Sequence, residues 1–251
     1  MTNAIFWSAF ATGTLLIGMV LAYRNLVSPK WTGLIMAFGA GAIISAATYQ
    51  LVLGAVDLEQ GSYFVVGLGL AAGALTYYFS DRYVEKMGGE ESKDEESKDN
   101  ENSEGGGSGM GILLGSLLDG VPESLVLGLS LVHTPEVSMA YIFAVAISNI
   151  PQGLGGTVDM LKSGWEKPKI TRIWLAVCGA AILAAALGYG LGQAFTGANG
   201  AFVDAFAAGA LLVVLTDSMI PESLEGGGKE AGLSLVLGFG VAVSMMLSQA
   251  S

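Results

Sequence analysis

Charged residues are scarce in this chain. They make up 13% of its 251 residues, against about 25% in an ordinary soluble domain, whereas 52% are hydrophobic and the mean hydropathy is +0.59. This balance excludes a soluble globular protein. It also excludes nucleic acid as a partner, because such proteins carry clustered basic residues. The expected surroundings of the chain are a lipid bilayer.

Cysteine, histidine and strand-like alternation are nearly absent. The single cysteine, Cys178, cannot form an internal disulfide, and the single histidine, His133, cannot complete an imidazole metal site. The 37 glycines favour helices packed closely through small residues over a β-barrel. No nucleophile with its base and no nucleotide motif is present, so an enzyme, a bound cofactor or an ATP-driven pump has no support.

What the sequence has instead is long apolar runs. At about 20 residues per crossing, they predict an all-α membrane protein with eight transmembrane helices. The predicted spans are Ala4–Tyr23, Trp31–Leu53, Tyr63–Ser80, Met110–Val132, Ser138–Leu161, Ile173–Phe195, Ala201–Pro221 and Ala231–Gln249. The first run lacks a basic n-region and a cleavage site, so we expect a retained helix and not a signal peptide.

The basic residues predict the orientation. All 11 Lys and Arg fall in the connections after the first, third, fifth and seventh spans. The other connections carry acidic residues such as Asp57, Glu59 and Glu136. Cytoplasmic loops are enriched in Lys and Arg, so both termini are expected outside, in an integral protein of the cell (plasma) membrane.

A strongly acidic segment divides the membrane domain. Residues 1–84 hold the first three spans, 85–109 form the acidic segment, and 110–251 hold the last five spans. The segment reads EKMGGEESKDEESKDNENSEGGGSG, with no aliphatic residue beyond Met87, and is therefore predicted to be a disordered cytoplasmic loop. It is either a solvated tether or a weak collector of cations.

Two similar motifs lie in the fourth and fifth spans. They read DGVPES from Asp119 and SNIPQG from Ser148, so Glu123 and Gln152 each follow a proline and Asn149 follows Ser148. Helical spacing of three and four residues places the polar side chains of each motif on one face. Each proline lacks an N–H and is expected to kink its helix there. Polar groups at this depth are usually reserved for a pathway or a partner, although hydrogen bonds between helices are the alternative.

The five oxygen-bearing side chains of Asp119, Glu123, Ser148, Asn149 and Gln152 are therefore expected to converge near the midplane. An all-oxygen set suits Mg²⁺, Mn²⁺, Ca²⁺ or Fe²⁺ better than tight Zn²⁺ binding. A carrier of zinc remains open, because weak coordination helps the ion to leave. The ion would be a transported substrate and not a cofactor.

Internal similarity accompanies these motifs. Residues 37–50 in the second span resemble residues 205–218 in the seventh, and the fourth and fifth spans resemble each other. Under the predicted orientation the members of each pair run in opposite directions, which is typical of transporters with inverted repeats. Asp217 and Glu222 flank Pro221 in a third related motif, and Asp159 either lines an exit or faces water.

With these residues the chain resembles the ZIP (Zrt-, Irt-like) family of metal-ion transporters. The resemblance implies a ZIP-like bundle of eight spans with both ends outside, a variable cytoplasmic loop after the third span, and ligands in paired HNxPEG-type motifs. Residue by residue it implies Asp119, Glu123, Asn149 and Gln152 as metal ligands, with Ser148 a weaker one. The family's usual histidine and second glutamate are replaced by Asp119 and Gln152, which argues against a two-metal centre.

We therefore expect a secondary transporter that moves a divalent cation, zinc or a similar ion such as manganese or iron, into the cytoplasm. Two alternatives stay open: a permease of the same fold that has lost the metal site, and a membrane sensor that binds metal without transport. The expected partners are the divalent ion and the lipid bilayer, and a homodimer is an arrangement that the sequence allows.

Overall fold

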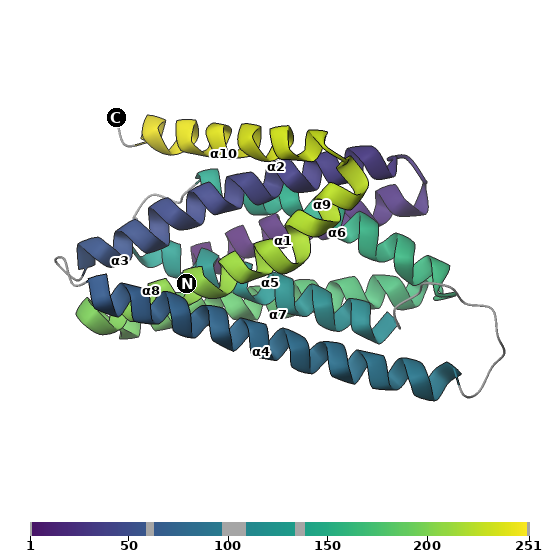
Figure 1. Cartoon of the computed structure of the whole chain (residues 1–251), viewed down its shortest axis with the longest axis horizontal. Coiled ribbons are helices and arrows are strands. Elements are labelled where there is room, and N and C mark those ends of the chain that lie inside the picture. Colours follow the sequence, from purple (N-terminus) through teal and green to yellow (C-terminus); the bar gives the residue numbers. More distant parts are fainter. Residues whose placement is uncertain (1, 59–62, 97–108, 134–138, 250–251) are drawn as a thin grey trace.

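The computed structural model describes residues 2–58, 63–96, 109–133 and 139–249, nearly all of which lie in helices (Figure 1). The elements are α1 (Thr2–Tyr23), α2 (Pro29–Ala47), the π-helix η1 (Thr48–Val52), α3 (Leu53–Leu58), α4 (Tyr63–Glu96), α5 (Gly109–His133), α6 (Met139–Lys162), α7 (Lys167–Ala194), α8 (Gly197–Val214), the π-helix η2 (Leu215–Met219), α9 (Ile220–Gly227) and α10 (Glu230–Gln249). The prediction of an all-α membrane protein is confirmed.

Seven stretches of the described residues are long and apolar enough to cross a membrane. They are Ala4–Tyr23, Pro29–Ala47, Tyr63–Val84, Leu114–Val132, Lys167–Ala194, Gly197–Gly227 and Glu230–Ser248. The eighth predicted span corresponds to α6, which is less apolar because it carries the SNIPQG motif and Asp159. Helix α6 packs along both α1 and α2, and its polar residues Ser148, Asn149 and Thr157 are buried against other helices.

Four helix pairs are packed backbone against backbone through glycine. In each pair, one glycine from each helix faces the partner so closely that an added Cβ would overlap a backbone oxygen. The glycines are Gly18 and Gly153 for α1–α6, Gly41 and Gly238 for α2–α10, Gly73 and Gly209 for α4–α8, and Gly128 and Gly188 for α5–α7. Small residues permit such close packing where lipid supplies no hydrophobic drive for helix association.

The four pairs are organised in two groups. The first bundle contains α1, α5, α6 and α7, and α1 contacts all three of the others. The second bundle contains α2, α4, α8 and α10, and its two pairs are linked because α3 packs against α8 and α9 packs against α2. Hydrogen bonds tie the helices within each bundle: Trp174 donates to Thr157 in the first and Ser234 donates to the Leu34 carbonyl in the second. The two bundles meet mainly where α2 runs along α6 and where α5 approaches α4 and α8.

The packing also reproduces the inverted repeat. In chain order, the eight predicted spans correspond to α1, α2, α4, α5, α6, α7, α8 and α10. If the first three spans are exchanged with the last three, and the fourth with the fifth, the α1–α6 pair becomes the α7–α5 pair and the α2–α10 pair becomes the α8–α4 pair. Gly41 and Gly209 occupy the same place in the similar runs of residues 37–50 and 205–218. Each run also leads into a π-helix, η1 or η2, so local structure repeats with the sequence.

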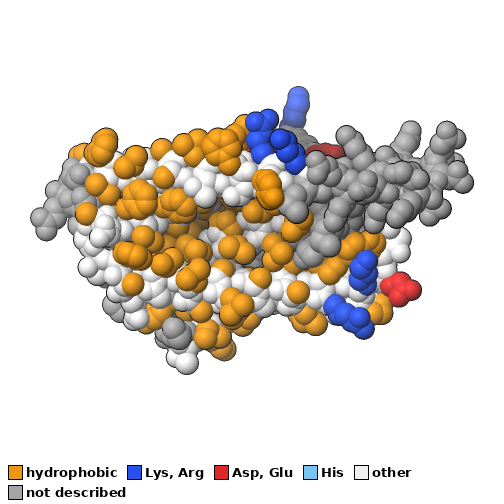
Figure 2. Space-filling view, turned by 90° about the horizontal axis from the view of Figure 1, so that it is seen from below, with side chains coloured by type: hydrophobic (Ala, Val, Ile, Leu, Met, Phe, Trp, Pro, Cys, Tyr) orange, Lys and Arg blue, Asp and Glu red, His pale blue; other side chains and the backbone are white. Residues whose placement is uncertain are grey.

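The ends of the bundle differ in charge. Figure 1 shows both chain termini towards one end, and the α1–α2 and α6–α7 connections together with the end of α4 at the other. In Figure 2 hydrophobic side chains are spread over the visible face, and the Lys and Arg side chains lie in the half towards that second end. We call it the basic end. The predicted acidic residues Glu59 and Glu136 lie outside the described residues.

Helix α4 extends well beyond the predicted end of its span at Ser80. It continues to Glu96, so the boundary drawn at residue 85 for a disordered loop falls inside the helix. The sequence there is rich in Glu and Lys, which are good helix formers even where nothing apolar is buried. Residues 97–108 of the predicted loop lie outside the described part of the chain.

The close glycine contacts predict strongly position-dependent effects of alanine. Gly73→Ala would push a methyl group into the Phe206 carbonyl, whereas at Gly67 on the same helix no atom lies within 4 Å of an added Cβ. We expect Gly73→Ala to destabilise the protein by about 1–3 kcal/mol through overpacking. Gly67→Ala, the matched control, should leave the melting temperature in detergent unchanged or higher. Equal melting temperatures for the two variants would contradict the described packing.

Candidate functional site

A cavity of about 410 Å³ penetrates the protein between the two bundles. Its lining comes from the parts of α4, α5, α6 and α9 nearest the basic end, from η2, and from Met36 of α2. Five carboxylates line it: Asp81, Asp119, Asp159, Asp217 and Glu222. Of the described residues in the lining, none is Lys or Arg, so the cavity attracts cations.

Asp119 is the most enclosed carboxylate of this cavity. It is 9% exposed, and its Oδ1 accepts a hydrogen bond of 2.9 Å from the Tyr77 hydroxyl of α4. Its Oδ2 accepts a bond of 2.8 Å from the Ser218 hydroxyl of η2 and a longer one of 3.4 Å from Nε2 of Gln152 in α6. One carboxylate thus joins four elements of the fold.

The two proline motifs meet at Asp119 and Gln152. Their side chains are in direct contact and both line the cavity, so these two of the five predicted site residues come together. Glu123 stands one turn further along α5, is 2% exposed, and lies outside the cavity lining. The Tyr141 hydroxyl donates to its backbone oxygen at 2.9 Å, in the helix turn that follows Pro122.

Ser148 and Asn149 are directed elsewhere in this conformation. The Ser148 hydroxyl donates to the Val145 carbonyl of its own helix at 3.0 Å, and the Asn149 amide donates to the Ala11 carbonyl of α1 at 3.0 Å. Ser148 also faces Gly39 of α2, where the absence of a Cβ lets the helices approach. Both residues are buried without lining the cavity, and their role as ligands stays a prediction.

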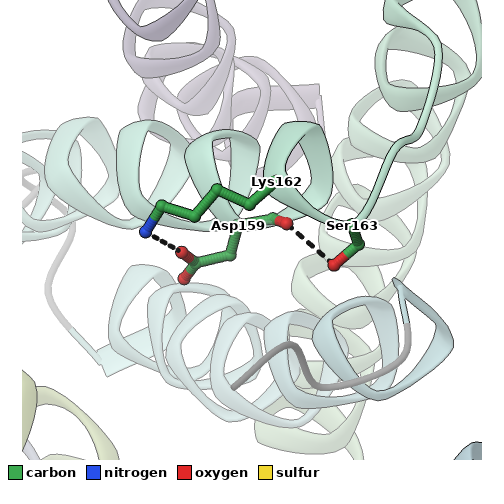
Figure 3. Close-up of polar contacts among 3 residues, drawn as sticks. All are labelled: Asp159, Lys162 and Ser163. Carbon is green, nitrogen blue, oxygen red and sulfur yellow. Dashed lines mark hydrogen bonds and ion pairs between the residues drawn. The ribbon is translucent and has the colours of Figure 1, made fainter. Parts of the chain in front are cut away.

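Asp159 lies at the solvent-exposed rim. Its carboxylate forms an ion pair of 3.1 Å with Lys162, and its backbone oxygen accepts a hydrogen bond from the Ser163 hydroxyl (Figure 3). The pair is exposed and contributes little to stability. Of the two alternatives for Asp159, the structure supports a position at the cavity mouth that also faces water.

Sequence reasoning did not identify Tyr77, Asp81 or Ser218 as site residues. Tyr77 lies in the run Thr76-Tyr-Tyr-Phe79, in which nothing in the sequence distinguishes the cavity side from the lipid side. Ser218 reaches Asp119 from a π-helix, which changes the helical register by about one residue and often occurs at functional sites. The repeated Thr-Tyr49-Gln and Thr-Asp217-Ser sequences were the available signal.

The site holds few formal charges close together. In the described part of the chain, no three side chains of His, Cys, Asp or Glu come close enough to hold a metal ion. A cation reaching Asp119 here would therefore meet one carboxylate, one amide and two hydroxyls. Such a set is suited to weak and reversible coordination, since carboxylate number tunes the affinity for hard cations.

Comparison with known proteins adds an independent finding. A family model described as ZIP zinc transporter matches residues 85–247, which is more than half of the chain and takes in α5 to α9 entirely. No curated protein matches the chain.

The position of the cavity predicts that water reaches it from the basic end of the protein and not from the opposite end. Gly155 lines it, and no atom lies within 4 Å of a Cβ added there. We expect Gly155→Cys in sealed vesicles to react with a membrane-impermeant maleimide applied at the basic end, because the native Cys178 thiol is buried. Gly13→Cys, equally unobstructed but outside the cavity, is the matched control. Labelling of Gly155→Cys only from the opposite side would refute the described opening.

Proposed function

The chain belongs to the ZIP zinc transporter family, and from this premise we propose that it carries a divalent metal cation into the cytoplasm as a secondary transporter. Members of this family are transporters and not enzymes, and they act within a membrane. The observation that supports the route best is the acidic cavity, which ends at a carboxylate shared between two helix bundles.

The proposed orientation follows from the basic end. Lys and Arg gather on the cytoplasmic side of membrane proteins, so the basic end faces the cytoplasm and both termini lie outside, in the cell membrane. The cavity then opens inwards, and the conformation is an inward-facing one. A cation that leaves Asp119 would pass Asp217, Glu222 and Asp159 on its way out, all of which line the cavity.

We assign the cation to the meeting point of α5 and α6. Asp119 supplies a carboxylate and Gln152 an amide oxygen, and these two side chains are already in contact. Glu123, one turn away and buried, is the second carboxylate of the proposed set, which would balance a divalent charge. Ser148 and Asn149 complete the proposed set after their side chains turn from their present partners.

Transport requires the site to open alternately to the two sides. The first bundle carries Asp119 and Gln152, and the second bundle faces it across a largely apolar surface. An apolar surface between rigid groups of helices lets one slide or rock against the other without breaking many directional bonds. Inverted repeats supply the two related conformations that such a movement needs.

The oxygen ligands favour hard and borderline divalent cations. Carboxylate, amide and hydroxyl oxygens suit Mn²⁺, Fe²⁺, Mg²⁺ and Ca²⁺, whereas tight zinc sites are dominated by nitrogen and sulfur. Zn²⁺ is retained among the proposed substrates because the family model is a zinc transporter model and because a carrier has to release its ion.

One observation favours a second candidate. Since the described residues contain no group of three carboxylate, imidazole or thiolate side chains able to hold a metal, a permease of the same fold that carries protons or another small cation is the alternative. A flux that is insensitive to every divalent ion tested would support it.

Removal of the central carboxylate should abolish most transport. We expect Asp119→Asn in proteoliposomes to lower divalent-cation uptake about tenfold or more, because a charge-assisted interaction with a buried carboxylate is worth about 1.5–3 kcal/mol. Glu123→Gln should also lower uptake. Glu225→Gln, at an exposed carboxylate outside the cavity lining, is the control and should retain most activity. Full uptake in both Asp119→Asn and Glu123→Gln would refute the site assignment.

Adding a carboxylate at position 152 should strengthen binding. In Gln152→Glu the new carboxylate would stand beside Asp119, and the affinity for Mn²⁺ and Zn²⁺ should rise about tenfold, since ligand charge sets the affinity for hard cations. Equilibrium binding to purified protein, with Gln193→Glu as a control outside the cavity, measures the effect. Unchanged affinity would place the cation elsewhere.

A further inference from the structure

Asp119 receives its two short hydrogen bonds from the opposite bundle. The Tyr77 hydroxyl donates to Oδ1 at 2.9 Å and the Ser218 hydroxyl donates to Oδ2 at 2.8 Å. Asp119 belongs to the first bundle through α5, whereas Tyr77 on α4 and Ser218 on η2 belong to the second. Each carboxylate oxygen is thus bound by a group that is not fixed to the same rigid unit.

A hydroxyl donor and a cation compete for the same oxygen. The donor presents a partly positive hydrogen to a lone pair of the carboxylate, and that lone pair is then unavailable to a metal ion. With a third donor, Nε2 of Gln152, at 3.4 Å, both oxygens of Asp119 are engaged. In the inward-facing arrangement the protein's own donors therefore take most of the lone pairs that Asp119 could offer to a cation.

On the basis of the proposed function, we propose that Tyr77 and Ser218 are positioning residues that promote cation release, by donating hydrogen bonds to Asp119 only when the two bundles are in the inward-facing arrangement. Movement of the first bundle separates Asp119 from both hydroxyls. The carboxylate then faces the other side of the membrane with free lone pairs and a higher affinity for the cation.

The two hydrogen bonds to Asp119 affect both cation binding and the conformational equilibrium, because the two are thermodynamically linked. An interaction that lowers the affinity for the cation in one conformation stabilises the empty form of that same conformation by an equal free energy. The two hydroxyls therefore speed unloading on the cytoplasmic side and hold the empty carrier inward-facing until it resets. The same hydrogen bonds hold Asp119 at the end of the cavity and stabilise its negative charge.

A role of the two hydroxyls as cation ligands predicts the opposite change in affinity when they are removed. If the Tyr77 and Ser218 oxygens were cation ligands, removing either hydroxyl would weaken binding. If they compete with the cation, removing either one leaves a carboxylate lone pair free and tightens binding. The direction of the change in affinity therefore decides between the two roles.

The test compares Tyr77→Phe and Ser218→Ala with wild-type protein. Zn²⁺ binding is measured by calorimetry in detergent and Zn²⁺ uptake in proteoliposomes, with Mn²⁺ as a second probe. We expect Kd to fall about threefold to tenfold in each variant, which is the range for a hydrogen bond to a charged group. KM and the maximal uptake rate should fall together, because the cation binds more tightly but leaves more slowly.

Matched controls exist on the same elements or beside them. Tyr78→Phe removes a hydroxyl from the exposed neighbour of Tyr77, and Ser223→Ala removes one that donates to the carbonyl of Ile220 and lies outside the cavity lining. Both should keep wild-type Kd and KM. Ser218→Thr keeps the donor and should behave as wild type, whereas a purely structural role of Ser218 would tolerate alanine better than the larger threonine.

A higher or unchanged Kd in both Tyr77→Phe and Ser218→Ala would overturn the inference. Ser218→Ala removes a single atom and keeps the test valid if Tyr77→Phe does not fold. Failure of the wild-type protein to bind or carry any divalent cation would instead defeat the proposed function, so the two failures are distinguishable.

Discussion

The arrangement depends on direct contact between helix backbones at four glycine pairs. In lipid, helices gain little from burying apolar side chains against one another, so close van der Waals packing has to hold them together. Each pair forms a stiff two-helix unit, and pairs of units form the two bundles. This stiffness positions Asp119, because α5 is fixed against α7 and α6 against α1.

Between the bundles the interaction has a different character. The surface where they meet is built from apolar side chains such as Ile43, Leu127 and Leu211, and two hydrogen bonds cross it to a single carboxylate. Within each bundle the helices are held by direct backbone contact at the glycine pairs, whereas the contact between the bundles combines apolar packing with hydrogen bonds to one charged group.

Much of the fold could be predicted from the sequence. The apolar runs gave the spans, and the AFxAG runs at Ala37 and Ala205 gave the repeat, because length and composition nearly determine whether a helix crosses a bilayer. The site could be predicted only in part. Spacing placed Asp119 and Gln152 on helical faces, but the rotation of α6 against α1, which turns Asn149 towards Ala11, depends on packing that no local pattern encodes.

The pairing of helices that are distant in the chain has a consequence for biosynthesis. The partner of α2 is α10, the last described helix, and the partner of α1 is α6. Because α1 is synthesised before α6 and α2 before α10, Gly18 and Gly41 cannot make their backbone contacts until those later helices have been synthesised. The second bundle therefore closes late, since Gly41 meets Gly238 only after α10 has been synthesised.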